Sequence, residues 1–91
     1  MIENQELLDQ AVLGRQVEEF LLTDVGKFLL AKAEDEYIMA LQSLSEVSAS
    51  DTLQILKLQS NARTASNFRA WLSEAVMSGL KAKEILEERE Y

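Results

Sequence analysis

The chain has 91 residues, of which none is proline, cysteine or histidine and only three are glycine. This length supports one domain at most, and 47% apolar with 27% charged residues is typical of a folded chain, not a disordered one. Without cysteine there is neither a disulfide framework nor a thiolate zinc site. Without histidine the chain lacks the commonest general base and the commonest transition-metal ligand. Sixteen acidic against nine basic residues give a net charge of −7, so composition predicts an acidic, folded chain with little means of catalysis.

The N-terminal segment 1–6 carries acidic residues, Glu3 and Glu6, where a secretory signal peptide requires positive charge. No apolar run in the sequence reaches the length of a transmembrane helix. We therefore expect a cytoplasmic protein that does not contact a membrane.

Residues 4–22 form the first predicted helix. Gly14 weakens its middle, and the junction at Leu22-Thr23-Asp24 is expected to bend or interrupt it. Whether this helix continues into the next or folds back is left open. Its apolar residues follow two stripes of helical spacing, which are Leu8, Ala11 and Val12 on one and Leu13, Val17, Phe20 and Leu21 on the other.

Residues 24–47 form the second predicted helix, with Thr23 as its N-cap and Asp24 favoured in the first turn by the helix dipole. Gly26 either permits a close helix approach opposite Leu72 or relaxes the bend at Thr23. The apolar residues step by three and four, which is a heptad seam and excludes a strand. The seam comprises Leu30, Ala33, Tyr37, Ala40, Leu44 and Val47, and it is widened by Phe28, Leu29 and Leu41.

A short polar stretch, residues 48–51, predicts a turn. Ser48 with Asp51 three residues later approximates a capping box, and Ser50 is the alternative cap of the next helix. Residues 51–88 then form one long predicted helix, because nothing inside them must break it. Its apolar stripe comprises Ile55, Leu58, Ala62, Ala65, Phe68, Leu72, Ala75 or Val76, Gly79, Ala82 and Leu86.

The predicted fold class is all-α. The two N-terminal helices together are about as long as the third, so we expect a long antiparallel helical hairpin with a turn near Ala49 and a bent or broken N-terminal arm. Charge supports this pairing, because residues 1–51 carry −8 and residues 52–91 carry +1. In such a hairpin residue i lies opposite about 98 − i. This register pairs Arg63 with Glu34-Asp35-Glu36, Lys81 and Lys83 with Glu18 and Glu19, and Arg15 with Glu84.

No group of residues predicts chemistry. The acidic cluster Glu34-Asp35-Glu36 does not converge on one ion, because successive helix residues point about 100° apart. Gly26-Lys27 lacks the spacing and the preceding strand of a phosphate-binding loop, and no serine has a histidine to activate it. We therefore expect a non-enzymatic protein with no metal and no cofactor.

Three basic residues of the third helix, Lys57, Arg63 and Arg69, are the candidates for contacts with nucleic acid. They step by six residues and so spiral around the helix instead of forming one face. The overall acidity of the chain also argues against direct nucleic-acid binding.

The heaviest apolar cluster contains Phe68 and Trp71. One interpretation places it in the core; the other places Trp71 on a second face as the anchor of a partner, since tryptophan is enriched in interface hot spots. Leu53 and Leu56 also lie off the main stripe, and such exposed apolar surface predicts a homodimer or a higher oligomer. The candidate partner-binding residues are Trp71, Phe68, Leu56, Leu53, Glu34, Asp35 and Glu36.

Three segments together give the chain a resemblance to a known group of proteins. They are 20–29 (FLLTDVGKFL), 33–36 (AEDE) with Leu41, and 69–75 (RAWLSEA) with 79–82 (GLKA). The pattern, which runs from Phe20 to Leu86, resembles the short, acidic, all-helical accessory proteins of tailed bacteriophages. The resemblance implies a phage-encoded accessory or assembly factor made in the host cytoplasm, with association with the virion as a further expectation. It assigns no functional residue.

Two functions are compatible with these features. The first is a helical protein–protein interaction module that acts as a homo-oligomer. The alternative is an acidic phage inhibitor whose carboxylates at Glu18, Glu19 and 34–36 mimic nucleic-acid charge and block a host defence or replication protein.

Overall fold

The computed structural model describes residues 3–90 and places most of them in three helices. α1 spans Asn4–Leu22, α2 spans Asp24–Glu46 and α3 spans Thr52–Arg89. No strand occurs within residues 3–90, so the prediction of an all-α chain is confirmed. The helix bounds differ from the expected ranges by at most one residue.

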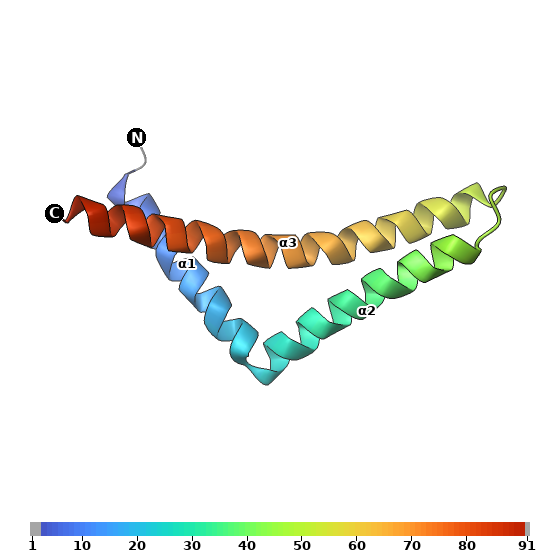
Figure 1. The fold of residues 1–91 in the computed structure, drawn as a ribbon, viewed down its shortest axis with the longest axis horizontal. Helices are drawn as coiled ribbons and strands as arrows, with labels where there is room; N and C mark the ends of the chain where they lie inside the picture. Colours follow the sequence, from blue (N-terminus) through green and yellow to red (C-terminus); the bar gives the residue numbers. More distant parts are fainter. Residues whose placement is uncertain (1–2, 91) are drawn as a thin grey trace.

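The three helices form a flat triangle, in which the first part of α1 crosses behind α3 (Figure 1). α3 forms the long side, and α1 and α2 form a V whose apex points away from it. Both short helices pack against α3 much more than against each other. The beginning of α1 and the end of α3 lie at the same corner, where the Arg89 guanidinium donates a hydrogen bond to Oδ1 of Asn4.

The apex of the V is a sharp bend of the chain built by two residues. Thr23 has an extended backbone and accepts a hydrogen bond from the Gly26 N–H at 3.0 Å, which confirms it as the N-cap of α2. Its hydroxyl also donates to the Phe20 carbonyl at 2.5 Å. A Cβ on Gly26 would lie 1.9 Å from that same carbonyl oxygen. Gly26 therefore serves the bend, the second of its two expected roles.

The connection between α2 and α3 is capped differently from the expectation. Asp51 is the N-cap of α3, and its carboxylate accepts a hydrogen bond from the Gln54 N–H at 3.2 Å. The assignment of the cap to Ser48 or Ser50 is wrong, because α3 begins directly after Asp51. The Ser48 hydroxyl instead bonds the Ser50 hydroxyl at 2.9 Å inside the turn.

The predicted seams of α2 and α3 are the residues that pack. Every residue of the α2 seam and every residue of the α3 stripe is buried or half-buried. Phe28, Leu29 and Leu41, which were expected to widen the α2 seam, are exposed. A single row of side chains on each of these helices accounts for the packing, because the neighbouring helix lies on only one side of it.

The packing of α1 confirms part of the predicted stripes, because Ala11, Val17, Phe20 and Leu21 are half-buried, and corrects the rest. Leu7, at 1% exposure, and Gly14 are its buried residues, whereas Leu8, Val12 and Leu13 are exposed. The reason is the crossing with α3, where Gly14 meets Gly79 so closely that a Cβ on either would lie 2.8 Å from the other's Cα. A glycine pair sets the helix separation here, so the contact is centred on Gly14 and not on the leucines beside it.

The molecule is thin, and the crossing of α1 with α3 is the place where one helix lies behind another along the shortest axis (Figure 1). The extents of the molecule are 61 × 32 × 14 Å, and the shortest is close to the diameter of about 10–12 Å of a helix with its side chains. The radius of gyration is 18.2 Å, against about 12 Å for a compact domain of this length. Domains usually bury their apolar faces between two packed layers, and this chain supplies only one.

Candidate interaction surfaces

The flat arrangement of the helices has two broad faces, and one side of α3 belongs to each face. The residues that line grooves along α3 fall into two sets of helical spacing, so each set occupies one side of the helix. The first set comprises Asn61, Thr64, Phe68, Trp71, Glu74, Ala75 and Ser78, and the second comprises Ser66, Arg69, Ser73, Val76, Leu80 and Lys83. We call the corresponding faces of the molecule the Trp71 face and the Arg69 face.

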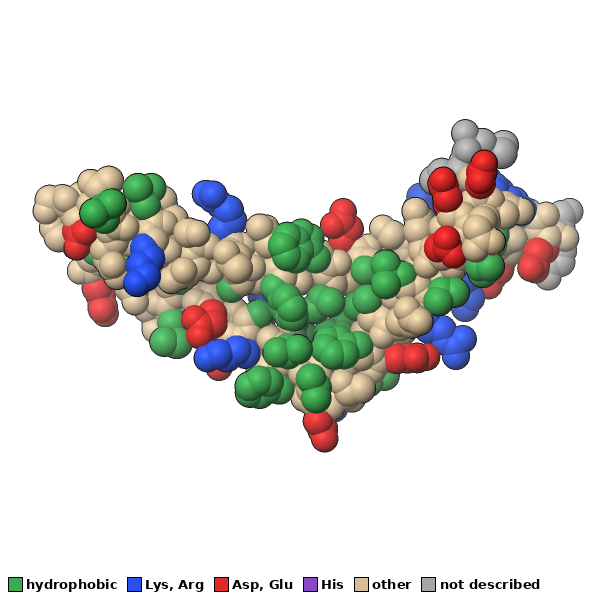
Figure 2. Space-filling view, turned by 180° about the vertical axis from the view of Figure 1, so that it is seen from behind, with side chains coloured by type: hydrophobic (Ala, Val, Ile, Leu, Met, Phe, Trp, Pro, Cys, Tyr) green, Lys and Arg blue, Asp and Glu red, His purple; other side chains and the backbone are tan. Residues whose placement is uncertain are grey.

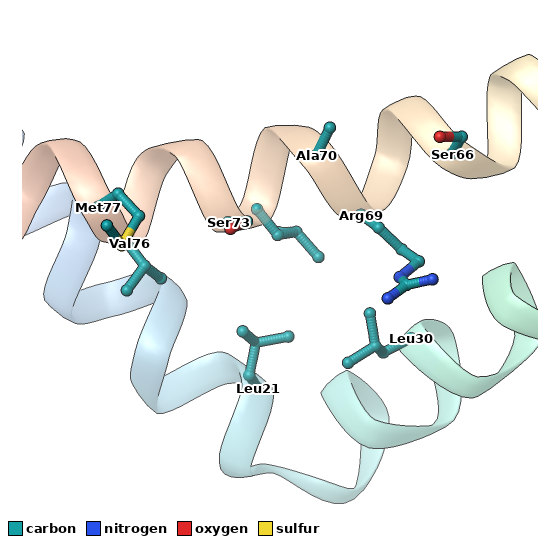
Figure 3. A pocket seen from close by; sticks show the side chains of 9 residues that line it. Leu21, Leu30, Ser66, Arg69, Ala70, Ser73, Val76 and Met77 are labelled. Atoms are coloured by element: carbon teal, nitrogen blue, oxygen red, sulfur yellow. The ribbon is translucent and has the colours of Figure 1, made fainter.

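The Arg69 face contains a cleft of about 510 Å³ where the V diverges from α3. Leu21 of α1 and Leu30 of α2 point into it from below, and the Arg69 side chain extends from α3 toward Leu30 (Figure 3). Ser66 and Ser73 add polar groups to the α3 side. The cleft is therefore mixed in character, with a cation among apolar and hydroxyl side chains.

Arg69 makes the ion pair that was expected of Arg63. Its guanidinium lies 3.6 Å from a carboxylate oxygen of Glu34, with both side chains about half exposed, whereas Arg63 is exposed and forms no ion pair among residues 3–90. The pairing of Arg63 with the 34–36 acids is thus wrong. Arg69 stands four residues after Ala65 and three before Leu72, on the side of α3 that faces α2.

Two other acids of α1 and α2, Glu19 and Glu36, form ion pairs within their own helices. Arg15 binds Glu19 at 3.1 Å instead of Glu84, and Lys32 binds Glu36 at 3.0 Å. Glu18 and Lys83 line one groove across the α1–α3 contact, as the register predicted for their charges. Within the described residues no three acidic side chains are placed to hold a metal ion together.

The Trp71 face is the more apolar of the two. One groove of about 380 Å³ runs between α2 and α3 and includes Leu29 and Phe68. A second groove, between α1 and α3, includes Leu13 and Trp71. Apolar side chains gather in the middle of this face, while charged ones lie mostly around its edge (Figure 2). Trp71 is 63% exposed, so it lies outside the core in this chain.

The candidate partner-binding residues do not form one site. Phe68 and Trp71 share the Trp71 face, with Phe68 half-buried. Leu53 is 82% exposed and Leu56 is exposed as well; Leu53 lies eighteen residues before Trp71, about 27 Å along the helix. Glu34 belongs to the ion pair with Arg69.

Sequence reasoning missed Leu13 and Leu29 as surface residues that accompany Trp71. Each lies on an expected apolar stripe, and periodicity alone cannot tell a residue packed in the plane from one that borders an open face. Whether such a residue packs between helices or borders an open face depends on the arrangement of the three helices, and no local sequence pattern indicates it.

The comparisons with other proteins give no related site to compare with these surfaces. No family model, no curated protein and no solved structure matches this chain. Among the described helices, none combines the length and the apolar character needed to cross a bilayer. The function is therefore argued from the geometry of the two faces.

Proposed function

We propose that the protein is a non-enzymatic helical protein–protein interaction module that acts as a homo-oligomer. The observation that carries the proposal is the single layer of helices, which leaves large apolar side chains such as Leu22, Val25, Phe28 and Trp71 more than half exposed. Surfaces of this kind mark sites of association in folded proteins. The unit that associates is the long antiparallel pairing of α2 with α3, with α1 as its bent N-terminal arm.

Light scattering at micromolar concentration tests this function. We expect a mass of at least twice the 10.3 kDa of one chain. A mass near that of one chain over the whole range up to 100 micromolar would overturn self-association. Dilution should lower the mass in a reversible manner, since association follows mass action.

The proposal also includes the biological role of this interaction module. The resemblance to accessory proteins of tailed phages supports a phage accessory or assembly factor acting in the host cytoplasm. Retention of tagged protein with purified virions, or with an assembly intermediate, is the expected result in an infected culture. Its presence only in the free protein pool at every stage would count against an assembly role.

The alternative, an acidic inhibitor that mimics nucleic-acid charge, receives less support. Glu19, Glu34 and Glu36, three of the five carboxylates it requires, are already paired with basic side chains of the same chain. Such pairs reduce the negative potential that a mimic needs. Salt discriminates the two functions, because a charge mimic loses its partner as ionic strength rises and an apolar contact does not.

A further inference from the structure

We propose that two copies of this chain stack through their Trp71 faces about a two-fold axis and form a two-layer particle of six helices. The inference rests on the self-association proposed above and adds which surface is covered. Trp71 and Leu13 of each copy, together with Leu29 and Phe68, form the centre of the contact.

The surface area of the chain supports a second copy as the occupant. The accessible surface is 7074 Å², whereas a compact monomer of 10.3 kDa exposes about 5,400 Å². The excess of roughly 1,700 Å² is about twice the ~800 Å² that each partner buries in an interface of standard size. One copy therefore carries enough surplus surface for a stable dimer contact on one face, without any rearrangement of its helices.

The distribution of side chains favours the Trp71 face over the Arg69 face. In a two-fold contact each patch meets its own copy, so the centre must be self-complementary. Apolar side chains in the middle of the Trp71 face meet this condition (Figure 2). Stacking through the Arg69 face would bring two Arg69 guanidinium groups and the hydroxyls of Ser66 and Ser73 from both copies into the contact, at a cost in desolvation.

The position of charge also permits this stacking. Each copy carries −7, and two copies repel at long range. The charged side chains of the Trp71 face lie mostly at its edge (Figure 2), and Glu74 is the charged residue of the groove that contains Trp71. Interfaces of this kind have an apolar centre and a polar rim. The Lys32–Glu36 pair, which borders the α2–α3 groove, is such a rim element.

The single tryptophan gives a direct readout, because all tryptophan emission comes from Trp71. The wild-type protein is diluted from about 100 micromolar while mass and emission are both followed. We expect the emission maximum to move to longer wavelength, and acrylamide quenching to increase, with the same midpoint as the loss of mass.

Two variants of α3 form a matched pair for the same measurement. Trp71→Glu and Met77→Glu add the same charge at positions of equal exposure, 63% and 64%, on different sides of one helix. We expect W71E to raise the dimer dissociation constant roughly 30-fold or more, as loss of an interface hot spot does, and M77E to raise it far less. Circular dichroism verifies that both variants retain the helix content of the wild type.

Each outcome bears on a different claim. A dimer in which Trp71 remains as accessible to acrylamide as in the diluted protein, or in which M77E is the more damaging variant, overturns the Trp71 face as the interface and leaves self-association intact. A wild-type mass of one chain at every concentration overturns the proposed function itself. If W71E loses helix content, Leu13→Glu on α1 replaces it, and an unchanged dissociation constant in a folded L13E protein also overturns the proposal.

Discussion

At the scale of single residues, the position of a side chain around α3 decides what it meets. Arg63 and Arg69 are six residues apart, so they point about 120° apart around the helix. Only Arg69 projects toward α2, where it reaches Glu34. The register estimated from the sequence placed Arg63 and not Arg69 opposite the acids, and register alone does not specify the side of the helix.

Charge reversal at these two arginines tests that difference. We expect Arg69→Glu to lower the free energy of unfolding by about 0.5–1 kcal/mol, the scale of a half-exposed ion pair, because it replaces an attraction to Glu34 by a repulsion. Arg63→Glu, its matched control, should change stability less. Urea unfolding at one fixed protein concentration measures both, and an equal or larger effect at Arg63 would contradict the observed pairing.

The glycine pair at the α1–α3 crossing gives a second prediction at this scale. Gly14→Ala should lower the free energy of unfolding by about 1–3 kcal/mol, because its Cβ would meet backbone atoms of Ala75 and Gly79 at 2.8 Å. Gly79→Ala should act in the same direction. In an uncrowded helix the same change stabilises by about 1 kcal/mol, so the sign of the effect in thermal or urea unfolding distinguishes close crossing from open space.

At the scale of elements, the helix ends are set by local hydrogen bonds that do not depend on the rest of the fold. Thr23 ends one helix and caps the next, and Asp51 caps α3. The sequence identified Thr23 but not Asp51, because serine and aspartate are about equally good caps and three candidates, Ser48, Ser50 and Asp51, stand within four residues. Only the observed start of α3 at Thr52 selects among them.

The cap of α3 is tested by removing one hydroxyl or carboxylate at a time. Asp51→Ala should destabilise by about 1 kcal/mol, the usual loss for an N-cap, because the Gln54 N–H loses its acceptor. Ser48→Ala should have a smaller effect, since its hydroxyl bonds only Ser50 within the exposed turn. A larger loss of stability for S48A than for D51A would restore the capping box as the correct interpretation.

At the scale of the whole molecule, the small thickness determines how much apolar surface is exposed and what shape a dimer would have. The shortest extent of 14 Å means that both broad faces of the layer border solvent in one copy. Stacking two such layers thickens the particle without lengthening it. An end-to-end association of the same two chains would instead extend the long axis.

Small-angle scattering separates these arrangements. For the dimer we expect a maximum dimension that stays near the 61 Å of one copy, together with an association that strengthens as salt screens the repulsion between two acidic chains. The comparison is made at low and at moderate ionic strength with the same protein concentration. A maximum dimension close to twice that of one copy, or weaker association in salt, would contradict stacking through an apolar face.

The sequence by itself determined the helices and which residues of α2 and α3 pack, since the period of apolar residues and the absence of helix breakers in α3 are local properties of the chain. One apolar stripe on each helix was enough to predict which residues pack between Leu30 and Val47 and between Ile55 and Leu86. The positions of the neighbouring helices were not needed for this. The tertiary structure decided the features that the period of apolar residues does not specify. It placed the Gly14–Gly79 crossing, turned Arg69 toward α2 in place of Arg63, and left Trp71 at the surface, because these depend on how the three helices meet.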